Sequence, residues 1–367
     1  MKGKPYGDRA VQILSRYLTD FSEEELRECV SAAYSKEKFG GFAAPLHLLK
    51  KDTDILELWH GPTSAFKDMA LQILPHFLTR AVRKTGEQKK SVILVATSGD
   101  TGKAAMAGFS DVPDTEVIVF YPHGGVSDAQ RLQMTTQRGN NVHAVAVEGN
   151  FDDAQTGVKL LFGKAELAAE LKEQGCAFSS ANSINWGRLV PQIVYYFSAY
   201  ADAVEKGRIQ NGTEIVFSVP TGNFGDILAG YYAKLMGLPV KKFICASNSN
   251  NVLTDFINTG TYDRNREFHR TISPSMDILV SSNLERLLYE KTEHNSEKIN
   301  EWMDALQEKG AIPLDVISRM PLSVTSLGLG SMKSKPRKQL VMSSITMAMS
   351  LIPIQLLPIR PYRSIAS

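Results

Sequence analysis

Short apolar segments rich in β-branched residues alternate with longer segments of helical periodicity between residues 91 and 247. This alternation is typical of βα units around a parallel sheet and predicts an α/β fold. The strand segments are nearly continuous apolar runs, so we expect both of their faces to be covered. The predicted strands are 91–96, 116–121, 142–147, 214–219 and 240–246.

Apolar residues spaced three and four apart predict the helices. The first is expected at 22–35, where Ser22 and Glu25 make a capping box. Others are expected at 65–85, at 186–206 and directly after Gly225.

Length and composition indicate a two-domain intracellular protein. With 367 residues, of which 43% are hydrophobic, the chain exceeds the size at which one core stops growing. Its 41 basic and 39 acidic residues nearly cancel, which argues against nucleic acid as a partner. Three widely spaced cysteines make neither a disulfide framework nor a metal site. No signal peptide is evident at residues 1–16, and we expect a cytoplasmic protein.

The segment 316–367 differs from the rest of the chain, because it has seven basic residues and no Asp or Glu. Its stretch 339–359 is uncharged and apolar, but Pro353 and Pro358 interrupt it and argue against a membrane helix. We expect an atypical tail that is translated in a shifted reading frame after about residue 315 or is disordered.

One lysine is placed for chemistry. The segment at 60–70 reads HGPTSAFKDMA, a Gly-Pro turn that leads into a helix with Lys67 in its first turn. Near the positive end of a helix an ammonium is disfavoured, which helps a lysine to act as an amine nucleophile toward an aldehyde. The alternative interpretation is an ordinary solvated lysine.

Two glycine turns follow predicted strands and begin helices. They read VATSGDTGKA from residue 95 and VPTGNFGDILAG from residue 219. Backbone N–H groups at such turns can bind a carboxylate or a phosphate, although both segments can also be plain tight turns. Their spacing fits neither the dinucleotide fingerprint nor the P-loop, which argues against NAD and ATP. An amine and two anion sites fit pyridoxal 5'-phosphate (PLP) with a charged substrate.

Six segments of the chain, in this order, resemble motifs of bacterial and fungal threonine synthases. They span about residues 17–288 and read HGPTSAFKDMALQ, ATSGDTGKAA, VEGNFDDAQ, NSINWGRLVPQIVYYF, SVPTGNFGDILAGYYAK and SPSMDILVSSNLERLL. The resemblance implies the two-domain PLP-dependent fold type II, similar to the tryptophan synthase β chain. We expect a larger cofactor-holding domain of 1–90 with 207–315, a smaller α/β domain of 91–206, and the tail 316–367.

The resemblance also implies roles for individual residues. Lys67 would form the Schiff base with PLP and move the substrate's α-proton. The cofactor phosphate would be bound by Gly222, Asn223, Phe224 and Gly225, and the substrate carboxylate by Ser98, Gly99, Asp100, Thr101 and Gly102. Asn185 and Arg188 would bind the substrate phosphate, for which a planar guanidinium is suited. Alternatively, Arg188 pairs with a surface acid at the start of its helix.

The implied activity is that of a carbon-oxygen lyase acting on phosphate, which converts O-phospho-L-homoserine and water to L-threonine and phosphate, the last step of threonine biosynthesis. The alternatives are another PLP-dependent β-eliminating enzyme, such as a serine/threonine dehydratase, and a truncated inactive relative. We expect a small-molecule substrate without nucleic acid, membrane or metal, and a monomer or weak homo-oligomer.

Two features depart from the family pattern. Family members usually begin with a further domain that contains Thr-Arg-Gly and Asp-Gly-Gly-Leu segments, and this chain starts after it. A His-Thr-Ala type motif, whose hydroxyl approaches the pyridine nitrogen, is not found after Asp315. The partner of that nitrogen therefore stays open.

Overall fold

The computed structural model describes residues 1–50, 53–271, 273–313, 322–326 and 354–358. The chain divides into two compact units. The first unit comprises residues 1–3, 44–57 and those from 196 on, and the second comprises 4–43 and 58–195.

The sheet of the second unit is parallel, as the α/β pattern predicts. It has the order β5-β4-β3-β6. Its strands are β3 (Lys90–Ala96), β4 (Thr115–Pro122), β5 (Val142–Val147) and β6 (Cys176–Ser180). The first three were predicted from their apolar runs. β6 was missed because its sequence, CAFSS, is short and ends in two serines.

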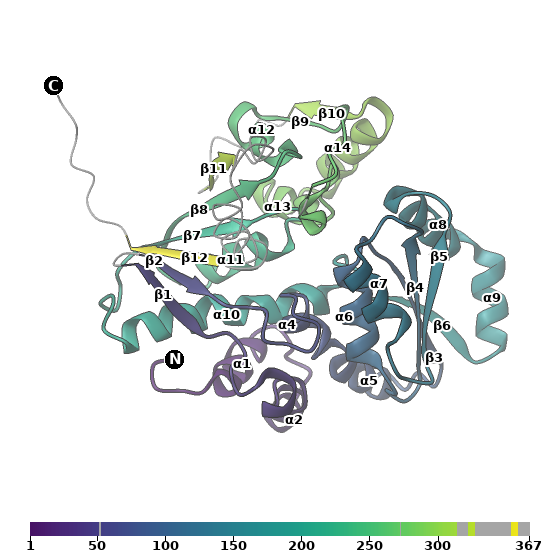
Figure 1. Ribbon diagram of the computed structural model, residues 1–367, viewed down its shortest axis with the longest axis horizontal. Helices are drawn as coiled ribbons and strands as arrows, with labels where there is room; N and C mark the ends of the chain where they lie inside the picture. Colours follow the sequence, from purple (N-terminus) through teal and green to yellow (C-terminus); the bar gives the residue numbers. More distant parts are fainter. Residues whose placement is uncertain (51–52, 272, 314–321, 327–353, 359–367) are drawn as a thin grey trace. The chain divides into compact units, whose positions relative to one another are not determined.

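Helices cover both faces of this sheet (Figure 1). On one face α6 (Asp100–Phe109) and α7 (Asp128–Thr135) supply Phe109 and Met134 to a buried cluster with Val95 and Val119. On the other face α8 (Phe151–Gly163) places Ala154 and Val158 against Val92 and Leu94. Burial on both sides explains the continuous apolar sequence of β3.

Strand β5 does not fit the expectation of two covered faces. It is one of the two edge strands of its sheet, and several of its side chains are exposed, including Val145 at 40%. An edge strand has a neighbour on one side only, and an apolar run alone does not reveal this position.

The predicted helix 65–85 is wrong as a single element. The chain forms α4 (Asp68–Leu71) and α5 (Leu74–Lys84), with Pro75 in the first turn of α5. A proline has no N–H, and its ring would clash with the carbonyl of the residue four positions earlier, which is Leu71. The capping box of Ser22 and Glu25 is confirmed at the start of α2. The other helices that belong wholly or partly to this unit are α1 (Tyr6–Leu14), α2 (Glu23–Ala33), α3 (Lys36–Phe39), α9 (Ala165–Glu173) and α10 (Trp186–Glu205), which continues into the first unit.

The six-stranded sheet of the first unit is mixed, with the order β1-β2-β12-β7-β8-β11. β7, β8 and β11 are parallel, whereas β12 is antiparallel to both β2 and β7. The strands are β1 (Leu46–Lys50), β2 (Thr53–Leu56), β7 (Ile215–Pro220), β8 (Val240–Ser247), β11 (Leu322–Ser326) and β12 (Ile354–Pro358). The predicted tail 316–367 thus contributes two strands. Its remaining residues lie outside the described part of the chain, and the shifted reading frame stays a prediction.

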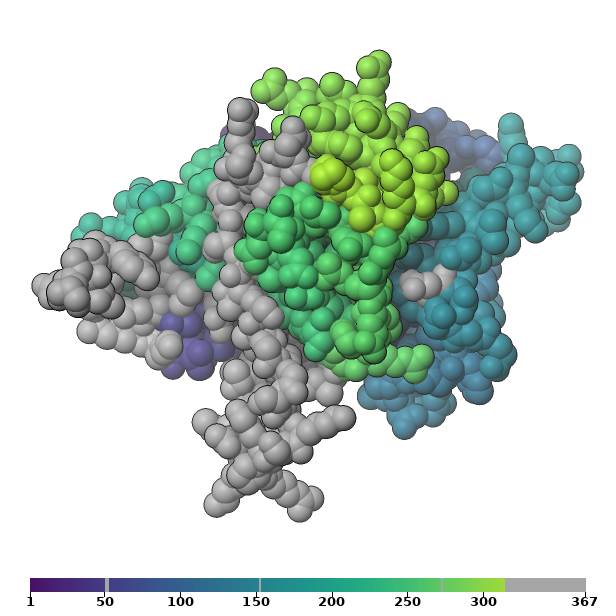
Figure 2. All heavy atoms as spheres, turned by 90° about the horizontal axis from the view of Figure 1, so that it is seen from above, coloured from purple at the N-terminus to yellow at the C-terminus, as the bar shows by residue number. Residues whose placement is uncertain are grey.

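Aromatic side chains form the centre of the first unit. The Tyr196 ring lies edge-on to Phe217, with centroids 4.8 Å apart, and Phe217 stacks on Phe243. Around this sheet lie α11 (Gly225–Leu235), α12 (Val252–Thr259), the 3₁₀ turn η1 (Pro274–Met276), α13 (Leu284–Lys291), α14 (Ser296–Lys309) and the pair β9 (Thr261–Asp263) with β10 (Ala311–Pro313). Residues close to 310, drawn yellow-green in Figure 2, lie at the surface. This agrees with α14, which has one apolar side with the buried residues Ile299, Trp302 and Leu306.

Residues 58–90 belong to the same compact unit as 91–195, whereas the sequence-based division placed them in one domain with 207–315. Packing explains this assignment, because Leu71 and Leu74 belong to the buried cluster around β3 and β4. Compactness does not by itself define domains that fold independently, so the predicted division stays a prediction. Among the described residues, no helix is long and apolar enough to cross a membrane.

Close packing of α6 on α4 makes Gly108 a test of the second unit. A Cβ at position 108 would lie 2.1 Å from the carbonyl oxygen of Leu71. We expect Gly108→Ala to lower the free energy of unfolding by about 2–3 kcal/mol, because the backbone must move apart. Gly157→Ala is the control, since nothing lies within 4 Å of its added Cβ, and it should stabilise α8 by about 0.5–1 kcal/mol. Denaturant unfolding measures both, and equal effects of the two variants would contradict the packing described.

Candidate active site

Lys67 follows a turn that is wound around a buried carboxylate. Asp68 is fully buried, and it accepts hydrogen bonds from the backbone N–H and the hydroxyl of Thr63, each at 2.8 Å. Gly61 permits this approach, since a Cβ there would lie 2.5 Å from the Cβ of Asp68. Burial raises the pKa of Asp68 above its ordinary value, and the two hydrogen bonds from Thr63 oppose that rise.

The dipole argument for Lys67 is corrected by the structure. Lys67 is the residue before α4, which has only four residues, so the aligned peptide dipoles of a long helix are absent there.

Charged and polar side chains that are buried or half-buried surround the Lys67 amine. Its Nζ lies 3.8 Å from Oδ2 of Asp100, and Nζ of Lys103 lies 3.1 Å from Oδ1 of the same carboxylate. Nε2 of Gln130 donates a hydrogen bond of 2.9 Å to that Oδ1. The Phe66 ring centroid is 4.6 Å from the Lys67 amine. Lys67 is only 8% exposed, so the alternative of an ordinary solvated lysine is wrong.

The first glycine turn, residues 98–102, is held from inside by Thr97. Its Oγ1 accepts hydrogen bonds from the N–H groups of Gly99 and Gly102, both at 2.9 Å. Gly99 has φ +131° and lies so close to Gln130 that no side chain fits. Within the described part of the chain, no group accepts from the N–H of Ser98 or Thr101. These two donors remain for an anion.

The second glycine turn, residues 222–225, lies in the first unit between β7 and α11. Phe224 adopts φ +65°, and a Cβ on Gly222 would lie 2.8 Å from the carbonyl oxygen of Ser275. Among the described residues, none accepts from the N–H groups of residues 222–225. Several unpaired N–H groups at the start of an eleven-residue helix make a cradle that fits a phosphate.

Asn185 and Arg188 stand at the start of α10. The Asn185 side chain donates to the Ser180 carbonyl at 2.8 Å and accepts from the N–H of Gly187, so one of its amide hydrogens remains. Arg188 is buried, and one of its Nη atoms donates to the Ala181 carbonyl. No partner is found for its Nε among the described residues. Burial lowers the pKa of Arg188 to about 10, which still leaves it charged at neutral pH.

That burial contradicts the alternative of a surface ion pair for Arg188. Within the described ranges, no carboxylate partner is found for its guanidinium, and burial alone shifts its pKa. A buried cation without a counterion is costly unless a ligand supplies the negative charge.

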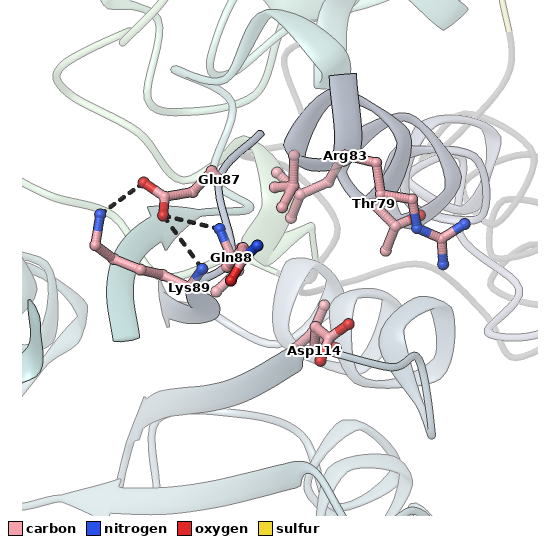
Figure 3. Close-up of a pocket in the computed structure, with 10 residues that line it drawn as sticks. Thr79, Arg83, Glu87, Gln88, Lys89 and Asp114 are labelled. Carbon is pink, nitrogen blue, oxygen red and sulfur yellow. Dashed lines mark hydrogen bonds and ion pairs between the residues drawn. The ribbon is translucent and has the colours of Figure 1, made fainter. Parts of the chain in front are cut away.

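The second unit also has a pocket that none of the site residues described above line. Figure 3 shows it between α5 and the amino ends of β3 and β4, where Glu87 accepts from the Lys89 amine and from the N–H groups of Gln88 and Lys89. Open α/β sheets bind ligands beyond the carboxyl ends of their strands, and the turn at 98–102 follows the carboxyl end of β3. We assign no role to this pocket.

Sequence reasoning missed four residues that shape these sites: Thr97, Asp68, Lys103 and Gln130. Lys103 could have been found, because it is three residues after Asp100 on one helix and such pairs are neighbours. Gln130 lies thirty positions from Asp100, and only the fold brings them together.

Comparison with known proteins identifies the family. The family model of pyridoxal-phosphate dependent enzymes matches residues 55–337. The chain is 41% identical to threonine synthase of Pseudomonas aeruginosa over 85% of this chain and 64% of that protein. It is 45% identical to human threonine synthase-like 1 over 84% of this chain, but it spans only 42% of that protein's length.

Solved structures agree with this assignment. The PLP-bound threonine synthase from Brucella melitensis superposes with a TM-score of 0.83 and 34% identity, covering 95% of this chain and 74% of that one. The predicted fold and the predicted cofactor are thereby confirmed. The chain belongs to the family of pyridoxal-phosphate dependent enzymes.

Proposed function

We propose that the chain is a threonine synthase, which converts O-phospho-L-homoserine and water to L-threonine and phosphate. The observation that carries the proposal is the buried Lys67 amine, held in the second unit with Asp100, a residue of the anion-binding turn at 98–102. The identity of 41% to a named threonine synthase supports it.

Each end of the cofactor has candidate partners in this chain. Nζ of Lys67 would hold the aldehyde end, and the N–H groups of residues 222–225 would hold the phosphate. PLP supplies an electron-withdrawing ring that stabilises negative charge on the substrate carbon skeleton. Everything else in the reaction requires side chains that bind the substrate and move protons.

Substrate binding and proton transfer are assigned to the second unit. The N–H groups of Ser98 and Thr101 would bind the substrate carboxylate, with Gly99, Asp100 and Gly102 completing the turn. Nζ of Lys67 would take the proton from the substrate Cα. The carboxylate of Asp100, which Lys103 and Gln130 hold in place, orients that amine.

Arg188 would bind the substrate phosphate and stabilise its charge as it leaves. Its burial and the unpaired Nε support this role. A phosphate dianion would balance the buried positive charge and accept a hydrogen bond from Nε. The remaining amide hydrogen of Asn185 would be a second donor. A cytoplasmic location and a monomeric or weakly oligomeric state stay predictions.

A second candidate is a β-elimination, such as the dehydration of threonine to 2-oxobutanoate. The relatives at 45% identity carry the name threonine synthase-like 1 instead of threonine synthase, which leaves a divergent activity and an inactive relative open as alternatives. Those proteins are also much longer than this chain. The two candidates differ in whether phosphate is released, so one assay separates them.

The decisive experiment measures free phosphate and threonine together from O-phospho-L-homoserine with PLP present. We expect both products in equal amounts, and we expect Lys67→Ala to lower their rate by at least about 10³-fold because it removes the amine. Lys159→Ala, which changes an exposed lysine on α8, should keep the activity of the unchanged protein. Formation of 2-oxobutanoate from L-threonine as the main product, without release of phosphate from O-phospho-L-homoserine, would overturn the proposal, and so would an unaffected Lys67→Ala variant.

Thr97 offers a test of the carboxylate-binding turn. Thr97→Val keeps the shape but strips the acceptor from two N–H groups, so we expect a loss of about 2 kcal/mol in unfolding free energy and a raised KM. Thr97→Ser retains Oγ and should stay close to the unchanged protein in both measurements. If Thr97→Val kept the original KM, the turn would not be the carboxylate site.

A further inference from the structure

The carbonyl groups of the second glycine turn are held by a neighbouring segment of the same unit, residues 279–283, here called the clamp segment. Oγ of Ser281 donates a hydrogen bond of 2.6 Å to the Gly222 carbonyl. The backbone N–H and the Nδ2 of Asn283 both donate to the Asn223 carbonyl, each at 3.1 Å. Three donors therefore fix two consecutive peptide groups of the turn.

The clamp segment is itself fixed by a buried tyrosine. The hydroxyl of Tyr262, on β9, donates to the Leu279 carbonyl at 3.0 Å and accepts from the N–H of Ser281 at 2.9 Å. Burial raises the pKa of Tyr262, so its hydroxyl keeps its proton and remains a donor. Asn283 is fully buried, which keeps water from replacing its hydrogen bonds.

Peptide planarity gives these contacts a direction. In a trans peptide the carbonyl of one residue and the N–H of the next lie in one plane and point in opposite directions. Holding the carbonyls of Gly222 and Asn223 on the clamp side therefore aims the N–H groups of Asn223 and Phe224 to the other side. Among the described residues, neither of these N–H groups has an acceptor.

We propose that Ser281 and Asn283 are positioning residues that aim the N–H groups of Asn223 and Phe224 at the phosphate of the cofactor. This inference rests on the proposed role of the turn at 222–225. A merely structural role would weaken the binding of any form of the cofactor to the same degree. A positioning role affects only the part of the affinity that comes from the phosphate.

The test compares PLP with pyridoxal, which carries the same aldehyde for Lys67 but no phosphate. Both are titrated into the cofactor-free chain of 367 residues, and the ratio of their dissociation constants is the readout. The unchanged protein should prefer PLP. We expect Asn283→Ala to reduce that preference about tenfold, and Ser281→Ala about threefold, because each loses hydrogen bonds that orient the turn.

Asn250→Ala is the matched control. It also removes a buried amide of the first unit, but that amide bonds to the His269 carbonyl and to Asp277 instead of the turn. It should leave the preference for PLP unchanged even where it lowers stability. Ser281→Ala, which removes a single hydroxyl, carries the test if Asn283→Ala does not fold.

Two outcomes would overturn the inference in different ways. If Asn283→Ala and Ser281→Ala keep the preference of the unchanged protein, the clamp segment has no positioning role, although the turn can still bind phosphate. If the unchanged protein itself binds PLP and pyridoxal equally, the proposed phosphate site at 222–225 is wrong, and the clamp inference with it.

Discussion

The carboxylate of Asp100, placed between two buried amines, is the interaction on which the candidate chemistry depends. An uncompensated charge cannot be buried cheaply, and here one carboxylate faces both Lys67 and Lys103. Lys103 lies closer, and Gln130 donates to the same oxygen, so both side chains hold the carboxylate in place. The Lys67 amine lies farther from this carboxylate, at 3.8 Å.

The two glycine turns orient their N–H groups by opposite means. In the first, a side-chain oxygen inside the turn uses two N–H groups and thereby sets the direction of the others. In the second, outside donors occupy the carbonyls, and the N–H groups have no acceptor among the described residues. Both turns need glycine where a neighbouring group comes too close for a Cβ, which is Gln130 at Gly99 and the Ser275 carbonyl at Gly222. The glycines are thus required by packing around the turn as well as by its shape.

Much of this could be predicted from the sequence, with limits that have physical causes. Five of the strands were predicted because they are apolar and long enough, while β6 was too short and too polar to be recognised. The helix predicted at 65–85 failed at Pro75, where a local steric clash outweighs the helical periodicity. Of the site, the motif residues could be predicted, because they are contiguous. Their supports, such as Gln130 for Asp100 and Asn283 for Asn223, are thirty and sixty positions away, and no local pattern indicates them.

The division of the chain into two units has a consequence for synthesis on the ribosome. Every residue of the second unit precedes position 196, so its core can form while the remainder is still being translated. The first unit must join residues 44–57 to segments that begin at 196, after the intervening chain has emerged. Closing so long a loop costs entropy that a folded insert reduces, since a compact body brings its two ends nearer than a random coil would. Any compaction of the second unit during translation would therefore lower the entropy cost of assembling the first.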